Sequence, residues 1–188
     1  MTDSLVESAL IFAARAHARQ KRKSTDVPYI VHPVSVMLLL MEHGEQDAEL
    51  LTAALLHDTV EDTGVTLEQI RAEFGPGVAE IVAGCSEPAK REHSWEERKR
   101  HTIAALPSAP RAVQLVSAAD KLHNLRSMVA DYATQGEALW SRFNRGRDSI
   151  AWYYRSIAES LGHGPWQAHP LIRDLNDVVY QFFGEAAT

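Results

Sequence analysis

The pair His57-Asp58 ends an apolar run, so an imidazole and a carboxylate are carried together into a hydrophobic setting. His32 and Asp120 stand in similar settings, one before a proline that can start a helix and the other after a mostly apolar stretch. Charged groups are rarely buried without a partner or a metal. Two imidazoles and two carboxylates form a mixed site that suits Mn²⁺ or Fe²⁺ and accepts Zn²⁺. Because such a site leaves positions open for water and a phosphate oxygen, the pattern predicts a metal-dependent phosphohydrolase.

Each of the four residues also has an ordinary structural interpretation. A single buried histidine more often makes a structural hydrogen bond than binds a metal. Asp58 could cap the next turn, and Asp120 could pair with Lys121 or Arg126. Short motifs often mislead when they are taken singly, but the four residues together form a far more specific pattern than any one of them.

Glu61 and Asp62 follow the pair within a few residues, so these acids should share one turn with it. A carboxylate beside a metal site can orient water, take its proton or protonate a leaving oxygen. The structural alternative is a solvated acidic turn that caps the helix starting near Thr66. Beside a metal site we favour the catalytic interpretation, and the division of roles between the two acids stays open.

A cluster of basic residues gives a clue to the substrate. Such clusters are usually solvated surface, but arginine forks suit phosphate oxygens and can stack on a base. This cluster comes shortly before His32, so it is expected to overhang the site. Its members are Arg15, Arg19, Lys21, Arg22 and Lys23.

Asn124 lies one turn after Asp120 on a predicted long helix, so the two side chains should face the same way. Asn124 is therefore placed to contact a ligand held by the metal. Lys121 and Ser127 are nearby candidates for the same role.

The elements that must position these residues are helices. Apolar residues recur at helical spacing almost throughout, and no convincing alternating strand interrupts them. Thr66 and Ser94 each begin a segment of capping-box form, which marks the start of a helix. The sequence therefore predicts an all-α fold, a single bundle over residues 1–188. The expected helices are 4–20, 33–44, 50–56, 66–74, 78–82, 94–106, 111–132, 139–161 and 166–183.

Bulk properties narrow the class of protein. A chain of 188 residues is long enough to bury a continuous core in one domain. The net charge of −6 argues against a general nucleic-acid binder, which needs an excess of Lys and Arg. Cys85 is the only cysteine, so a cysteine-rich zinc site and an intrachain disulfide are excluded. With no secretory signal at the start and no apolar stretch of bilayer length, we expect a cytoplasmic protein without membrane contact.

Three motifs follow one another in order: Tyr29-Ile30-Val31-His32-Pro33, the segment from Ala53 to Thr63, and the segment from Ala119 to Leu125. Together they resemble the hydrolase domain of RelA/SpoT proteins, which belong to the HD-domain phosphohydrolases. The resemblance runs from about Ala9 to Ser127, and the middle motif is highly specific. It implies a single HD-domain helical bundle. Because no nucleotide-synthetase domain fits in the remaining chain, it also implies a stand-alone small alarmone hydrolase.

That family removes pyrophosphate from the 3′ position of (p)ppGpp with Mn²⁺. The resemblance implies that the catalytic acidic pair, which acts on the attacking water, is Glu61 and Asp62. It implies that the metal ligands are His32, His57, Asp58 and Asp120. It assigns the contact with the purine to Arg22, with Lys23 beside it. It implies that the remaining nucleotide contacts are made by Lys121, Asn124 and Ser127.

The chain departs from the long bifunctional enzymes in its slightly longer loop 24–27, in the stretch 85–95 and beyond Tyr132. These departures leave the base open between (p)ppGpp and (p)ppApp, with NADPH as a further candidate because some animal members act on it. Another HD-domain nucleotide phosphohydrolase would share the metal site but need neither the acidic pair nor the basic loop. A non-catalytic nucleotide-sensing protein would have lost a ligand or an acid, and none is missing.

The C-terminal segment is rich in aromatic residues that could form either core or the surface of a homodimer. We favour the core because a packed interior needs large apolar groups more often than a partner does. The residues concerned are Trp152, Tyr153, Phe182 and Phe183.

Overall fold

The structure is a computed structural model that describes residues 4–88 and 91–184. Within these ranges the fold is all-α, as predicted, and the only strand-like feature is an isolated bridge between Lys21 and Pro28. The α-helices are α1 (Leu5–Ala16), α2 (Val31–Glu42), α3 (Ala48–Leu56), α4 (Thr59–Asp62), α5 (Leu67–Phe74), α6 (Pro76–Cys85), α7 (Trp95–Ala105), α8 (Arg111–Gln135), α9 (Gly146–Gly162) and α10 (Pro170–Phe183). Two 3₁₀ segments, η1 (Leu106–Ser108) and η2 (Gly136–Arg142), lie on either side of α8.

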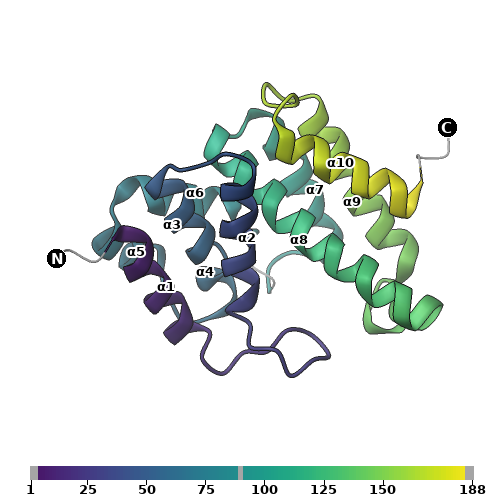
Figure 1. Cartoon of the computed structure of the whole chain (residues 1–188), viewed down its shortest axis with the longest axis horizontal. Helices are drawn as coiled ribbons and strands as arrows, with labels where there is room; N and C mark the ends of the chain where they lie inside the picture. Colours follow the sequence, from purple (N-terminus) through teal and green to yellow (C-terminus); the bar gives the residue numbers. More distant parts are fainter. Residues whose placement is uncertain (1–3, 89–90, 185–188) are drawn as a thin grey trace.

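The long helix α8 runs between two groups of helices (Figure 1). On one side α3 packs against α1, α2 and α6, while on the other α9 and α10 pack against each other and against α8. Helix α2 packs on both α3 and α8, so it joins the first group to the central helix. The residues carried by α2, α3 and α8 therefore meet near the middle of the molecule.

Two clusters of buried apolar side chains hold this arrangement together. The larger one surrounds α8, where Leu122 and Leu125 are fully buried, and it extends into α9 and α10. The smaller one lies between α1, α3, α5 and α6, around Leu55 and Phe74. Tyr153 and Phe183 are buried in the larger cluster, and Trp152 and Phe182 pack against it, so the core interpretation of these aromatic residues is confirmed.

Helix starts follow the local signals in the sequence. Thr66 and Ser94 both form complete capping boxes, with Gln69 and Glu97 as their reciprocal partners. Helix α2, however, begins at Val31, two residues before the predicted start at Pro33. A proline is tolerated in a first helical turn because its missing N–H has no partner to lose there. His32 therefore lies inside α2 rather than before it.

Three other predicted helices differ from the structure. The first helix ends at Ala16 instead of residue 20, because the following residues form separate turns. The predicted helix 139–161 is divided into η2 and α9, and Gly146, the first residue of α9, has a φ of 69°, which few residues other than glycine adopt readily. The last helix begins at Pro170 rather than residue 166, with the His169 side chain capping it.

Glu45, in the loop after α2, fixes that helix against α8. Its buried carboxylate accepts two hydrogen bonds from Arg111 at the start of α8, at 3.0 and 2.5 Å. His169, just before α10, lies 2.9 Å from the same carboxylate. These contacts join three segments at one point and hold α2 in place beside α8.

The burial of Leu125 yields a stability prediction. Leu125→Ala removes a fully buried side chain from the centre of the larger cluster, and it should lower the free energy of unfolding by about 3 kcal/mol. Leu38→Ala on α2 is the matched control, because Leu38 is 46% exposed and its loss should cost less than about 0.5 kcal/mol. Urea denaturation of both variants measures the difference, and equal losses would contradict the packing described.

Candidate active site

Four side chains from three regions of the sequence converge beside α8. His32 lies in the first turn of α2, and His57 follows α3 directly. Asp58 precedes the short helix α4, and Asp120 lies within α8. Both histidines are almost fully buried, and the carboxylates keep only 21% and 12% of their side-chain surface exposed.

The distances place these side chains around a common point. His32 Nε2 lies 3.3 Å from Asp58 Oδ2 and 3.2 Å from Asp120 Oδ1. His57 Nε2 lies 3.1 Å from Asp58 Oδ2 and 3.9 Å from Asp120 Oδ1. Ligand atoms of His32, His57 and Asp58 all fall within 4.8 Å of one another. The structure thus brings together all four residues predicted as metal ligands.

His57 supplies the direct test of whether a metal fits here. Its Nδ1 lies 2.8 Å from the carbonyl oxygen of Ala54 and must donate to it, so Nε2 of the neutral ring carries a lone pair. That buried Nε2 has no hydrogen-bond partner among the described residues, although Asp58 approaches it. An unpartnered nitrogen lone pair between two carboxylates is an arrangement that a divalent cation satisfies.

The same setting changes the proton affinity of His57. Burial alone would lower the pKa of the ring, but the negative charges of Asp58 and Asp120 outweigh it and raise the pKa to about 9. Without a metal, a proton therefore balances part of the carboxylate charge. A metal ligand must be the neutral ring, so a bound cation would replace that proton.

His32 is oriented by a second imidazole. Its Nδ1 lies 2.7 Å from Nδ1 of His123, and the ring centroids are 4.9 Å apart with the ring planes inclined at 36°. Burial and the neighbouring His32 lower the pKa of His123 to about 4, so its ring is neutral at pH 7 and can accept a hydrogen bond. With His123 accepting, His32 donates from Nδ1 and keeps its Nε2 lone pair on the side of the carboxylates.

Both carboxylates have further polar partners. The hydroxyl of Tyr29 donates to Asp58 Oδ2 at 2.6 Å. Asn124 donates to Asp120 Oδ1 at 2.6 Å, and Lys121 donates to Asp120 Oδ2 at 2.5 Å. Although burial opposes the ionised form of Asp120, the charge of Lys121 holds its pKa below the usual range. The prediction that Asn124 faces the same way as Asp120 is confirmed.

The two acids Glu61 and Asp62 have different surroundings. Glu61 is half-buried, accepts the backbone N–H of Glu87 at 2.6 Å, and has its pKa raised by burial. Asp62 is exposed and accepts a hydrogen bond from the Gln20 side chain at 3.0 Å. Both line the same pocket as His57.

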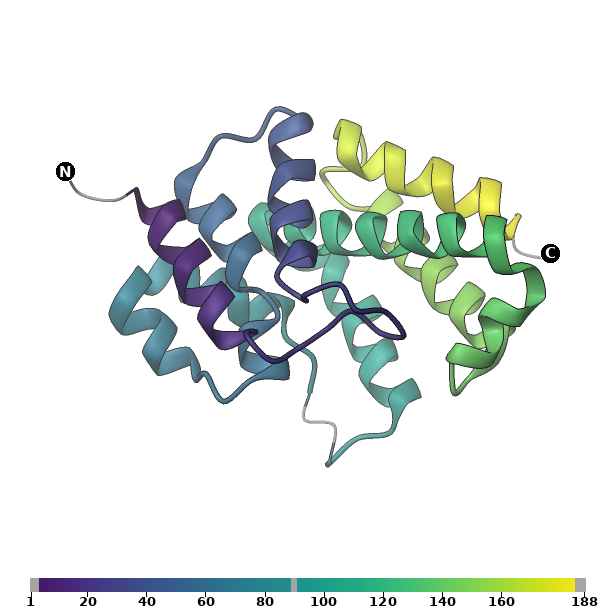
Figure 2. The same ribbon diagram turned by 60° about the horizontal axis from the view of Figure 1, so that its bottom comes forward.

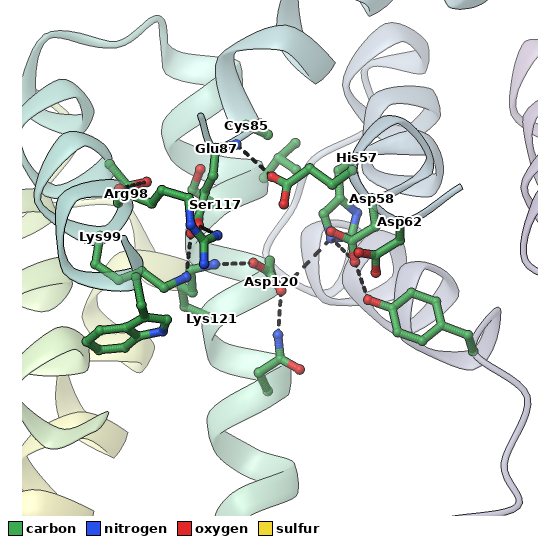
Figure 3. A pocket seen from close by; sticks show the side chains of 16 residues that line it. His57, Asp58, Asp62, Cys85, Glu87, Arg98, Lys99, Ser117, Asp120 and Lys121 are labelled. Carbon is green, nitrogen blue, oxygen red and sulfur yellow. Dashed lines mark hydrogen bonds and ion pairs between the residues drawn. The ribbon is translucent and has the colours of Figure 1, made fainter. Parts of the chain in front are cut away.

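This first pocket has a volume of about 300 Å³ and is lined mainly by polar side chains. In Figure 3, Arg98, Lys99 and Lys121 lie on one side of it and His57 on the other. The carboxylate of Glu87 holds the cations together, accepting a hydrogen bond from Arg98 at 2.7 Å and another from Lys99. Positive charge thus faces the candidate metal ligands across a space open to a small anion.

A second pocket of about 510 Å³ adjoins the first, since Tyr29 and Asn124 line both. Its lining is largely apolar. Arg22 reaches it from the loop 17–30, which runs from α1 past the start of α2 toward α8 (Figure 2). The guanidinium of Arg22 donates to Asn124 Oδ1 at 2.9 Å and lies 5.8 Å from the centre of the Tyr29 ring. The other predicted substrate residues in this pocket are Lys23 and Ser127.

The rest of the predicted basic cluster lies away from the pockets. Lys21 pairs with Asp26 at the surface, at 2.6 Å. Arg15 and Arg19 are exposed and line neither pocket. The expectation that the whole cluster overhangs the site was therefore wrong. Helix α1 ends early, and only the part of the loop that begins with Arg22 reaches Asn124.

Several residues of the site were missed by the sequence analysis. Arg98 and Lys99 lie on the helix that the Ser94 capping box predicted, but nothing in their spacing shows that this helix closes the pocket. Glu87 lies in the stretch that departs from the family pattern. Tyr29 and His123 were also missed, although each stands inside a recognised motif. His17 and Gln20, whose contacts connect to the site, stand among the basic residues 15–23, and no motif includes them.

Cys85 also lines the first pocket, but burial raises the pKa of its thiol to about 12. A thiol that stays protonated is a poor metal ligand and a poor nucleophile. The chemistry of the pocket therefore rests on its imidazoles, carboxylates and cations.

A family model described as "HD domain" matches residues 9–151, which include all four candidate ligands. The chain belongs to the HD-domain family. This membership confirms the resemblance that the three sequence motifs indicated. Across residues 4–88 and 91–184, every helix is too short or too polar to cross a bilayer.

Two curated proteins similar to this chain are named as pyrophosphohydrolases. The chain is 42% identical over 119 residues to a zebrafish protein named guanosine-3′,5′-bis(diphosphate) 3′-pyrophosphohydrolase MESH1, covering 62% of this chain and 65% of that protein. It is 42% identical over 181 residues to an Aquifex aeolicus guanosine-3′,5′-bis(diphosphate) 3′-pyrophosphohydrolase, covering 94% of this chain. The alignment spans only 24% of the Aquifex protein, which is much longer.

Solved structures confirm the fold. A metazoan ortholog of SpoT that hydrolyses ppGpp aligns with a TM-score of 0.81 and 26% identity, over 98% of this chain and 99% of that one. A Listeria monocytogenes protein aligns with a TM-score of 0.75 and 36% identity, over 82% of this chain and 99% of that one.

The raised pKa of His57 predicts how metal affinity depends on pH. Below a pKa of about 9 the metal-free site holds a proton that Mn²⁺ must displace, so affinity should increase with pH. The increase should be about tenfold per pH unit for one displaced proton, and it should level off above the pKa. Calorimetric titrations in two buffers of different ionisation enthalpy measure both affinity and proton release. An affinity independent of pH, with no proton released, would contradict this account of His57.

The contact between the two imidazoles predicts a second effect on metal binding. His123→Leu removes the acceptor for His32 Nδ1, and it should weaken Mn²⁺ binding by about 10-fold to 100-fold. His101→Leu is the control, since His101 is exposed on α7 and lines neither pocket. Equal Mn²⁺ affinity in the two variants would show that His123 does not orient the ligand.

Proposed function

We propose that this protein is a Mn²⁺-dependent hydrolase that releases the 3′-pyrophosphate of purine alarmones, (p)ppGpp or (p)ppApp. The observation that carries the proposal is the position of the ligand cluster in a polar pocket, opposite three cations, beside a second pocket that is largely apolar. A phosphate group and a nucleoside need these two environments side by side. The names of the curated relatives support the same reaction.

Under this proposal Mn²⁺ is held by His32, His57, Asp58 and Asp120. The mixed nitrogen and oxygen donors suit Mn²⁺, and they would accept Fe²⁺ or Zn²⁺. The unpartnered Nε2 of His57 and the short distances between the donors support this assignment. When bound, the ion supplies Lewis-acid polarisation of phosphate oxygens and makes a nearby water easier to deprotonate.

Glu61 and Asp62 then accept and donate the protons that the reaction transfers. The water oxygen forms a bond to the phosphorus nearest the sugar, and the bond from that phosphorus to the 3′ oxygen breaks. Asp62 accepts a proton from the water, and Glu61 gives one to the leaving 3′ oxygen. The raised pKa of Glu61 supports its role as the donor, because it favours the protonated form before reaction.

The cations of the first pocket bind the charged groups of the substrate. Lys121, Arg98 and Lys99 provide donors for phosphate oxygens on the side opposite His57. In the free protein Glu87 holds Arg98 and Lys99 in position for this role. The diphosphate therefore lies between these cations and the ligand cluster.

The nucleoside occupies the second pocket. Arg22 stacks on the purine, with Lys23 beside it, and Asn124 and Ser127 contact the sugar or base. Asn124 already links Arg22 to Asp120 through two hydrogen bonds, so the binding positions of the base and of the metal are fixed relative to each other. The apolar lining suits a purine ring of either kind, and the choice between guanine and adenine is left to experiment.

We propose that residues 1–188 form one domain that acts in the cytoplasm and binds neither nucleic acid nor membranes. Light scattering would show whether the protein is a monomer or a homodimer.

The proposed reaction predicts a defined product pattern. Incubation with Mn²⁺ and ppGpp, ppApp, NADPH and simple nucleotides, resolved by chromatography, should show pyrophosphate released from ppGpp or ppApp with the 5′ diphosphate intact. Asp62→Asn should lower the rate by at least about 100-fold, because the amide cannot accept the proton from water. Release of single phosphates from NADPH or simple nucleotides alone would instead identify a nucleotide phosphatase. Unchanged activity of Asp62→Asn would refute the assigned role of Asp62.

Variants of two neighbouring basic residues distinguish stacking of Arg22 on the purine from a general effect of positive charge. Arg22→Ala should raise KM by about tenfold, since it removes the stacking partner of the purine. Lys21→Ala removes the same charge from the adjacent position, where the side chain pairs with Asp26 outside both pockets, and should leave KM within about twofold of the unsubstituted protein. Steady-state kinetics of both variants give the comparison. Equal increases in KM would mean that the loop acts only through its charge.

A further inference from the structure

Gln20 bridges a buried histidine and one of the two acids. It lies in the turns between α1 and α2, where its Nε2 donates to Asp62 Oδ2 at 3.0 Å. Its Oε1 lies 2.7 Å from Nδ1 of His17, the residue that follows α1. His17 is only 2% exposed. None of the reaction steps described above uses His17 or Gln20.

The chemistry of the three groups fixes the direction of both hydrogen bonds. An ionised carboxylate can only accept, so Gln20 must turn its NH₂ group toward Asp62. The amide oxygen then faces His17, which must donate from Nδ1. His17 is therefore the Nδ1–H tautomer, and its Nε2 has no hydrogen-bond partner within the described part of the chain.

The backbone around Gln20 is also fixed. The N–H of Gln20 donates to the carbonyl oxygen of His17, and the carbonyl oxygen of Gln20 accepts from the N–H of Tyr29, both at 2.9 Å. The His17 ring packs against that of Tyr29, with centroids 4.8 Å apart and ring planes inclined at 37°, and the Tyr29 hydroxyl donates to Asp58. One short segment is thus connected to Asp62 through Gln20 and to Asp58 through Tyr29.

We propose that Gln20 is a positioning residue that holds the carboxylate of Asp62 for proton transfer, and that His17 fixes the orientation of the Gln20 amide. The inference rests on the proposed role of Asp62. Asp62 is the last residue of the four-residue helix α4, so its direction depends on side-chain contacts as well as on the helix. A misplacement of about 1 Å in a reacting group can cost about 100-fold in rate.

Gln20→Met tests the first part, because methionine has similar length but no amide donor. Its kcat should fall by about 10-fold to 100-fold, while KM and Mn²⁺ affinity change by less than about twofold. Gln46→Met is the matched control, since Gln46 is exposed in the loop between α2 and α3 and lines neither pocket. An unchanged kcat would overturn the proposal. So would equal losses in kcat, substrate binding and metal binding, which would indicate a purely structural role.

A pair of variants tests whether His17 fixes the orientation of the Gln20 amide. His17→Asn keeps a side-chain N–H close to the position of Nδ1, and it should retain most of the kcat. His17→Phe keeps the ring but has no donor, and its kcat should fall by about tenfold with KM unchanged. If the two variants lose activity equally, or neither loses it, His17 does not orient Gln20.

Nitrogen NMR of the substrate-free protein provides a test that needs neither activity nor substitution. With ¹⁵N-labelled histidine, the ring of His17 should show a proton on Nδ1, and a proton on Nε2 instead would overturn the proposed orientation. Absence of alarmone hydrolysis by the unsubstituted protein would refute the proposed function, while the NMR result would still decide how His17 and Gln20 are arranged.

Discussion

Two carboxylates are held beside two buried imidazoles, with little access to water, and the rest of the structure must make this arrangement stable. Burying a carboxylate without compensation costs several kcal/mol. Asp58 is compensated by the Tyr29 hydroxyl and Asp120 by Lys121, and the histidines add positive charge when they are protonated. A divalent cation replaces those protons with a stronger and more localised charge. The burial that makes the metal-free site costly to assemble thus also favours the binding of a cation that neutralises the carboxylates.

The helices explain how residues distant in sequence reach one point. Helices α2, α3 and α8 pack on one another, and each carries or adjoins part of the ligand set. The Glu45 and Arg111 ion pair holds the far end of α2 against the start of α8. The loop 17–30 then crosses to α8, where Arg22 contacts Asn124. The metal cluster, the acids and the apolar pocket are therefore parts of one packed unit.

Much of this could be predicted from the sequence, and the limits have physical causes. The all-α fold and the convergence of His32, His57, Asp58 and Asp120 followed from local periodicity and from motifs whose residues act together. The side of the first pocket opposite His57 could not be predicted. The burial of Arg98 and Lys99 there depends on how α7 packs, which no local pattern encodes. The break at Gly146 was missed for a related reason: helical periodicity continued on both sides of a short turn.

The central claim is that the four converging side chains bind one divalent cation. Crystals grown with Mn²⁺ and measured at the manganese absorption edge test it most directly, because anomalous scattering locates the metal itself. We expect a single strong peak in contact with His32, His57, Asp58 and Asp120. No peak there, or a peak held by other residues, would contradict the account.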